Sequence, residues 1–397
     1  MTGIPGMGGF CYPKSIFDSF DENYSKGSNF KETLDCSVII PTCIINTDVE
    51  NLLNVLLKEK LLIREIIIVI DGPEILANHL PLKFKIKPVR IFCTGKQMGC
   101  SVARNVGLDV ASGDIILFLD SDCMPEEGIV QTHLKKYTKS NVVAVGGIVD
   151  FVGNNSLQSR LVMNSCLLDA FSQAKRYERL WWNPTANFSI KREALGNTRF
   201  DDSFPKKGGG EDVFIGFMLK KEGRIIAEPN AVVKHPVWSG WRNLIRRFFR
   251  WGWAEAILTA KAKKSSDLDI PLVRRELSII SLLFISFIFS LPFVFLFSNK
   301  TILLVSLGVF LGWEIAAIFS PRRKKPILDE MADQFFCLVF DLGSTLGRLT
   351  PKGWNGLNSR IVFYPDQLYA LWENTQLCER AGFFGGFIVF LLSIAFG

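Results

Sequence analysis

The chain has 397 residues, a formal net charge of +7 and nine cysteines. Its mean hydropathy of +0.22 is high for a wholly soluble protein and indicates a globular part joined to membrane segments. The cysteines form no C-x-x-C pair and no Cys/His cluster with zinc spacing. This pattern argues against a structural zinc site and a disulfide framework, and it favours free thiols in a reducing compartment.

Residues 1–34 are interpreted as an N-terminal extension. They lack the basic region followed by an apolar core that marks a secretory signal. We therefore expect the globular part of the chain to lie on the cytoplasmic side of a membrane.

Short apolar runs rich in β-branched residues come next, and they are typical of buried parallel strands. The runs are residues 37–41, 65–71, 89–93 and 114–120. Helical spacing fills the intervals at residues 48–62 and 101–111. Strand and helix in alternation predict an α/β domain over residues 35–241, with right-handed crossovers and a mostly parallel sheet covered on both faces.

Asp71 and Asp120 follow two of these strands at their carboxyl ends, the edge where such sheets bind ligands. A turn-forming role would also explain either aspartate. The sequence Asp120-Ser121-Asp122 adds a second carboxylate after one spacer. Two such carboxylates suit a hard divalent cation, Mg²⁺ or Mn²⁺, that bridges phosphates and offsets charge on a departing diphosphate.

Several motifs occur together in this region. Residues 99–107 read G-C-S-V-A-R-N-V-G, residues 111–114 read A-S-G-D, and residues 119–122 read L-D-S-D. The set resembles the family 2 glycosyltransferases of GT-A fold, an inverting, metal-dependent family that uses nucleotide-sugars. The family usually has two acids at the end of the second strand, whereas here the first of these positions is Ile70.

The resemblance implies a role for individual residues of the donor side. Asp71 would bind the nucleotide base, and Asp120 and Asp122 would hold the metal together with His235, which could also be an ordinary packed histidine. The further donor contacts that it implies are Pro41, Arg104 and Ser121.

The run Gly208-Gly209-Gly210-Glu211-Asp212 resembles the G-G-E-D motif of the same family. The resemblance implies that Asp212 is the catalytic base, because inverting transfer needs a carboxylate to take the proton of the attacking hydroxyl. Glu211 would contact a sugar, and Gly209 and Gly210 would allow close approach of the acceptor. The acids could also simply begin a helix.

Arg247-Phe248-Phe249-Arg250-Trp251 resembles the R-x-x-R-W element of membrane-integrated polysaccharide and glycolipid synthases. Arg247 and Arg250 would pair with the donor diphosphate, and Trp251 would provide a flat surface for a sugar. A basic amphipathic helix on anionic lipid, over residues 242–276, is the alternative. The pair Trp181 and Trp182 is equally consistent with acceptor stacking and with the core.

Two long apolar segments follow, and residues 277–320 are predicted to form a transmembrane hairpin. Basic residues flank it on both sides, which places both ends in the cytoplasm and accounts for the net charge without nucleic acid. Residues 321–397 are predicted to hold an interfacial helix at 335–349 and a possible third membrane helix at 381–397.

The leading hypothesis is an inverting glycosyltransferase of an internal or cell membrane. It would move a sugar from a nucleoside-diphosphate sugar, UDP being the family's commoner choice, to a lipid-linked or membrane-proximal saccharide. A sugar nucleotidyltransferase is one alternative, but the loop at residues 41–46 has neither the glycine nor the lysine that it needs. A non-catalytic membrane scaffold is the other.

Overall fold

A large mixed β-sheet organises the part of the chain that the computed structural model describes. That part comprises residues 34–274 without 86, 139–140 and 266, residues 304 and 308, and residues 326–364. The strands of the sheet are β1 (Cys36–Thr42), β2 (Ile63–Ile70), β3 (Val89–Cys93), β4 (Ile115–Leu119), β5 (Met124–Pro125), β6 (Val142–Val152), β7 (Arg179–Leu180), β8 (Asn187–Lys191) and β9 (Arg224–Pro236).

The strands lie in the order β3-β2-β1-β4-β8-β6-β9-β5, with β7 paired to β9. β1 runs parallel to β2 and β4, and β2 runs parallel to β3. β8 is antiparallel to both β4 and β6, while β6 and β9 are parallel. The predicted α/β class and the four predicted parallel strands are therefore confirmed, and the rest of the sheet mixes both directions.

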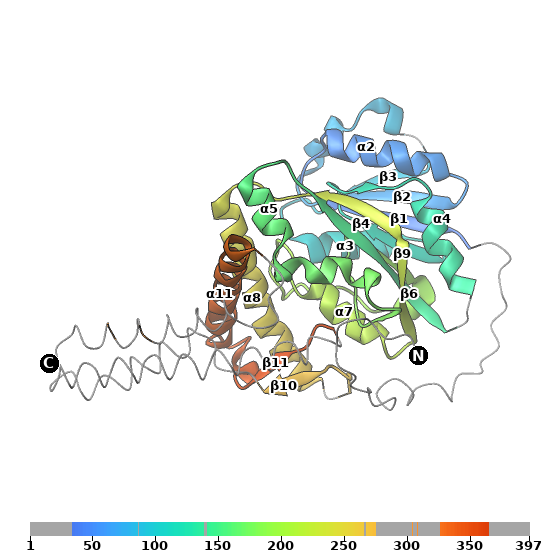
Figure 1. Ribbon diagram of the computed structural model, residues 1–397. Helices are drawn as coiled ribbons and strands as arrows, with labels where there is room; N and C mark the ends of the chain where they lie inside the picture. The colour runs from blue at the N-terminus through green and yellow to red at the C-terminus, as the bar shows by residue number, and fades with distance from the viewer. Residues whose placement is uncertain are drawn as a thin grey trace, which may run out of the picture. The chain divides into compact units, whose positions relative to one another are not determined.

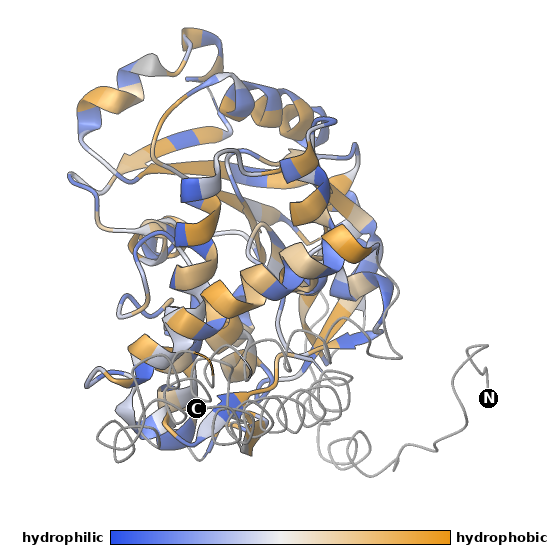
Figure 2. Ribbon diagram, turned by 60° about the vertical axis from the view of Figure 1, so that its left-hand side comes forward, coloured by the Kyte–Doolittle hydropathy of each residue, from blue (hydrophilic) through white to orange (hydrophobic). Residues whose placement is uncertain are grey.

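Helices cover both faces of the sheet (Figure 1). Val38 and Ile40 of β1 pack with α2 (Thr47–Leu56), whereas Ile39 between them packs with α3 (Cys100–Val110) on the opposite face. Alternate residues of a strand point to opposite faces, and a strand buried on both faces has to be apolar throughout. Figure 2 shows the corresponding contrast between mostly hydrophobic strands and helices with both hydrophobic and hydrophilic residues.

The remaining helices extend the covering layers. They are α4 (Ile129–Leu134), α5 (Leu157–Met163), α6 (Arg192–Leu195), α7 (Glu211–Leu219), α8 (Trp241–Lys264) and α11 (Ile327–Arg348). The predicted helix at residues 48–62 is α2, which ends at Leu56 and tightens into a 3₁₀ turn at Leu57–Glu59. This earlier end leaves the chain room to turn into β2.

α8 and α11 lie side by side (Figure 1) and approach each other closely at glycines. A Cβ added at Gly252 of α8 would overlap the carbonyl oxygen of Phe340, and one at Gly343 of α11 would overlap that of Phe249. Because any larger residue would push the backbones apart, glycine is required at this crossing.

A buried ion pair holds the same two helices together. The Arg348 guanidinium donates to both carboxylate oxygens of Glu255, at 2.6 Å and 2.7 Å, and both side chains are almost fully buried. The carbonyl oxygens of Gly356 and Ser359 accept further hydrogen bonds from it, at 3.0 Å and 2.8 Å. The charges are thus fully compensated, as buried charges must be.

Among the described residues, no helix is both long enough and apolar enough to cross a bilayer. The predicted hairpin at 277–320, the possible membrane helix at 381–397 and nearly all of the extension at 1–34 lie outside the described residues. The interfacial helix predicted at 335–349 falls within α11, whose side facing away from α8 exposes a stripe of apolar residues. The stripe is Leu328, Met331, Phe335, Leu342, Leu346 and Leu349.

Candidate active site

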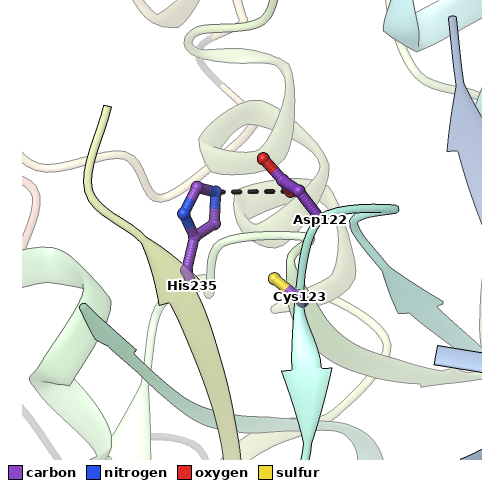
Figure 3. Close-up of side chains that lie close together, drawn as sticks. All are labelled: Asp122, Cys123 and His235. Carbon is purple, nitrogen blue, oxygen red and sulfur yellow. Dashed lines mark ion pairs between the residues drawn. The ribbon is translucent and has the colours of Figure 1, made fainter. Parts of the chain in front are cut away.

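The end of β4 and the end of β9 bring the predicted metal ligands together. After β4 the chain turns through Asp122 into β5, which pairs antiparallel with β9 so that Met124 lies opposite Lys234. This pairing places the Asp122 carboxylate 3.5 Å from Nε2 of His235 (Figure 3). The Cys123 thiol lies in the same group, with the three ligand atoms all within 4.8 Å of one another.

The imidazole of His235 is oriented for ligation. Its Nδ1 lies 2.7 Å from the Pro236 carbonyl oxygen, which can only accept, so Nδ1 carries a proton and Nε2 is the ring nitrogen that faces Asp122. A carbonyl partner of this kind is usual behind metal-binding histidines. A carboxylate and an imidazole lone pair facing each other fit a divalent cation such as Mg²⁺ or Mn²⁺.

The thiol of Cys123 is a poorer ligand than its position suggests. Burial raises the pKa of Cys123 well above its ordinary value, so that the group remains a neutral thiol without a metal. Burial also raises the pKa of Asp122, while His235 opposes that shift. Asp122 and His235 thus face each other with the Cys123 sulfur as their neighbour, and metal binding by this pair stays a prediction.

Arg104 of α3 connects the two acidic motifs. Its Nη2 donates to Asp120 at 3.3 Å, and its Nη1 donates to Glu211 at 3.0 Å. The guanidinium is buried, and its Nε has no hydrogen-bond partner among the described residues. Arg104 therefore pairs with Asp120 on one side and Glu211 on the other, and a metal contact of Asp120 stays a prediction.

Asp71, at the end of β2, organises the loop before α3. Its carboxylate oxygens accept from the backbone amides of Met98 at 2.7 Å and Gly99 at 2.9 Å, and from the Thr94 hydroxyl at 3.1 Å. Both oxygens are thus engaged by the protein. A contact between Asp71 and a nucleotide base stays a prediction.

A loop of three glycines positions the predicted base. Gly208, Gly209 and Gly210 have φ angles of 82°, 133° and 89°, which strongly favour glycine. The Gly209 amide donates to Glu211 at 2.6 Å. Glu211 therefore accepts hydrogen bonds from both the glycine loop and Arg104. Gly209 also lies close to Trp251.

Asp212 is the second residue of α7 and has an unusual environment. Burial, together with the neighbouring carboxylate of Glu211, raises the pKa of Asp212 to about 8. A carboxylate with a pKa near the working pH can both accept and release a proton, as general-base catalysis requires.

The arginines of the R-x-x-R-W element lie on α8 and face different partners. The Arg247 guanidinium lies 4.0 Å from the centre of the Trp238 ring, and burial lowers the pKa of Arg247 to about 10. The Nε of Arg250 donates to the Gly208 carbonyl at 3.2 Å. Trp251 packs against Trp238, with their ring centres 5.6 Å apart.

An aromatic cluster joins the metal ligands to α8, and the sequence analysis did not identify it. Trp238 contacts the rings of His235 and Trp251, and Phe151 and Phe171 complete the cluster. Trp238 follows His235 by three residues at the end of β9. That short spacing is the one local signal that could have placed it at the site.

The remaining predicted residues have mainly structural contacts. Trp182 is buried, and its Nε1 donates to the Phe363 carbonyl at 2.9 Å. Trp181 lies beside Lys220. Pro41 is opposite Val69 in the sheet, and Ser121 lies in the turn after β4. Acceptor or donor contacts of these four residues stay predictions.

Comparison with known proteins identifies the domain that carries the first half of this site. Residues 37–205 match the model of glycosyl transferase family 2. Over 155 residues the chain is 28% identical to polypeptide N-acetylgalactosaminyltransferase 3 of Drosophila melanogaster, covering 36% of this chain and 21% of that protein. Over 142 residues it is 30% identical to an uncharacterized glycosyltransferase of Haemophilus influenzae, covering 34% of this chain and 54% of that protein.

A third relative is the glucosyl-dolichyl phosphate glucuronosyltransferase of Haloferax volcanii, which is 31% identical over 87 residues, or 21% of this chain and 28% of that protein. The similarity spans about half or less of the length of these relatives. The family match at residues 37–205 includes the strands and loops that position Asp71, Arg104, Asp120 and Asp122. This part of the chain is therefore similar to glycosyl transferase family 2.

Proposed function

We propose that this protein is an inverting, metal-dependent glycosyltransferase that moves a sugar from a nucleoside-diphosphate sugar to a lipid-linked or membrane-proximal saccharide. The observation that carries the proposal is the double contact of Arg104 with Asp120 and Glu211. It joins the metal-binding motif and the motif of the base, separated by about ninety residues of sequence, into one site.

Different residues would act on the donor and on the acceptor. Asp122 and His235 would hold the cation, and a bound Mg²⁺ or Mn²⁺ would offset the negative charge on the leaving diphosphate. Arg247 lies on the same side, within electrostatic reach of Asp122 and Asp120, and is suited to pair with the diphosphate.

Asp212 acts on the acceptor. It takes the proton of the attacking hydroxyl while the hydroxyl oxygen bonds to the anomeric carbon. The bond from that carbon to the diphosphate breaks, and the nucleoside diphosphate leaves with the electron pair. Attack from the face opposite the leaving group inverts the anomeric centre.

Two observations support an acceptor at the membrane. The apolar stripe of α11 is exposed along the helix, as in helices that lie in a bilayer interface. One relative is named for action on glucosyl-dolichyl phosphate, a lipid-linked sugar. We accordingly propose a membrane location with the catalytic domain on the cytoplasmic side.

The test is turnover of nucleotide-sugars by the purified full chain with Mg²⁺ or Mn²⁺. We expect release of nucleoside diphosphate from at least one member of a donor panel, and its loss on chelation. Asp122→Asn should weaken metal-dependent turnover roughly 10- to 100-fold, the usual cost of a disturbed metal site. Asp109→Asn, at an exposed ion pair with Arg199, is the matched control.

Folded protein that neither binds nor turns over any nucleotide-sugar would refute the proposal and favour a scaffold. Turnover without a metal, unchanged by Asp122→Asn, would support the glycosyltransferase activity. It would contradict the proposed metal dependence.

A further inference from the structure

A cavity of about 710 Å³ opens beside the glycine loop. Three segments line it: residues 202–206, which lead into the glycine loop, one side of α8, and the turn at residues 350–352 after α11. The last of these segments lies far outside the family domain. The cavity therefore depends on the packing of α11 against α8, which brings residues 350–352 to this place.

Each segment contributes one cation to the lining, namely Lys206, Arg250 and Lys352. Within the described part of the chain, none of the three forms an ion pair. The ammonium groups of Lys206 and Lys352 each lie 3.5 Å from a neutral backbone carbonyl, that of Gln97 and that of Ser203. Three cations against one lining acid, Asp202, favour an anionic ligand.

Arg250 has the strongest need for an anion. It is half-buried, and its one hydrogen bond among the described residues goes from Nε to the neutral Gly208 carbonyl. Its burial lowers the pKa of Arg250, which shows that desolvation of this charge is not fully compensated. A phosphate would supply the missing negative charge through paired hydrogen bonds.

The rest of the cavity wall is apolar. Phe249, Trp253 and Ile257 project from one side of α8, and Phe204 lies opposite. The exposed apolar stripe of α11 ends at Leu349, the residue before the cavity turn begins at Thr350. The apolar wall and the adjoining end of this stripe suit the hydrocarbon part of a lipid.

We propose that this cavity binds the phosphate and the first part of the hydrocarbon chain of a lipid-linked acceptor. The proposal rests on the proposed function and makes it more specific. It assigns Arg250 to the acceptor, whereas Arg247, one helical turn earlier, faces Trp238 and the metal ligands. The contact of Arg250 with Gly208 places the lipid phosphate next to the glycine loop, so that the attached sugar lies near Asp212.

The experiment measures binding of inorganic phosphate and of butyl, pentyl and hexyl phosphate to the full chain in discs of uncharged lipid, by calorimetry. Inorganic phosphate should bind weakly. Each added methylene should raise the affinity by up to roughly fourfold, as expected when the chain enters an apolar cavity. Lys352→Glu and Lys206→Glu should each weaken hexyl phosphate binding by roughly tenfold and leave nucleotide-sugar binding unchanged.

Lys263→Glu, an exposed lysine near the end of the same helix α8, is the control and should change nothing. Trp253→Leu should reduce the dependence on chain length without affecting inorganic phosphate. Equal affinity for all the phosphates would show an anion site without a lipid site and overturn the proposal. Weaker nucleotide-sugar binding in the lysine variants would overturn it too, by assigning the cavity to the donor.

These outcomes are separable from the proposed function itself. Alkyl phosphates could bind as described to a protein that turns over no nucleotide-sugar. Conversely, a working transferase in which none of the cavity variants alters alkyl phosphate binding would exclude this cavity as the acceptor site.

Discussion

The family domain and the residues that follow it build their halves of the site in different ways. Within residues 37–205, carboxylates stand at strand ends and are held by backbone amides or by Arg104. Beyond residue 205, Asp212 depends on a loop of three glycines, and Arg247 and Arg250 depend on the position of α8. The sheet fixes the first half and also His235 of β9, whereas contacts between helices fix the arginines of the second half.

The two halves of the site should therefore be sensitive to different substitutions. Sheet hydrogen bonds are many and individually replaceable, whereas the α8–α11 crossing relies on a few glycines and one ion pair. Substitutions at the crossing should therefore disturb Arg247 and Arg250 while Asp122 stays in place. The predictions below test this separation, beginning with the largest effect.

Asp212→Asn should reduce transfer by roughly 10²- to 10⁴-fold, the usual contribution of a general base. Donor binding should change little, because in the proposed mechanism Asp212 acts on the acceptor and not on the donor. Transfer rates and donor affinity measured on the same preparation check both statements. Glu222→Gln, an exposed acid beyond the end of α7, is the control, and unchanged transfer in Asp212→Asn would remove Asp212 from the mechanism.

Glu255→Gln or Arg348→Met should each destabilise the fold by about 3–5 kcal/mol, because each leaves one buried charge without its partner. Denaturant unfolding measures this loss. The double variant Glu255→Leu/Arg348→Met should recover most of it. If the single variants unfolded no more easily than Asp267→Asn, which breaks an exposed pair with Lys221, the crossing would not hold the second half of the site.

Transfer should depend on pH through Asp212. Because its pKa is about 8 and only the ionised form accepts a proton, the rate should rise with pH and level off above about 8. The rise from pH 6 to pH 8 should be about fiftyfold. A rate that is flat over this range would contradict the assignment.

The same pKa shift has a consequence for stability. The folded pKa of Asp212 lies above its ordinary value of 3.8, so the folded state binds the proton more tightly than the unfolded state. The contribution of Asp212 to stability therefore declines as pH rises from about 4 to about 8. Asp212→Asn should remove this decline and raise the melting temperature at pH 8, since the amide carries no charge to desolvate.

Much of the first half of the site could be predicted from sequence. Continuous apolar runs fixed the strands, and Asp71 and Asp120 were expected at their carboxyl ends, where the structure has them. The meeting of Asp122 with His235 was expected from the family resemblance. It depends physically on the pairing of β5 with β9, which no local pattern reveals.

The second half shows what sequence reasoning could not reach. The partner of Arg247 is Trp238, an aromatic residue that has no distinctive motif. The pairing of Glu255 with Arg348 spans 93 residues, and no periodicity connects positions so far apart. Likewise, Arg104 was expected to contact the donor, yet its position between Asp120 and Glu211 became evident only in three dimensions.

The crossing of α8 and α11 also connects other parts of the structure to the arginines of the site. β10 (Leu272–Arg274) pairs with β11 (Ser359–Ile361), and this strand pair and α11 both contact α8, the helix that carries Arg247 and Arg250. A force on α11 or on the strand pair would therefore load the α8–α11 crossing and reach the arginines through α8.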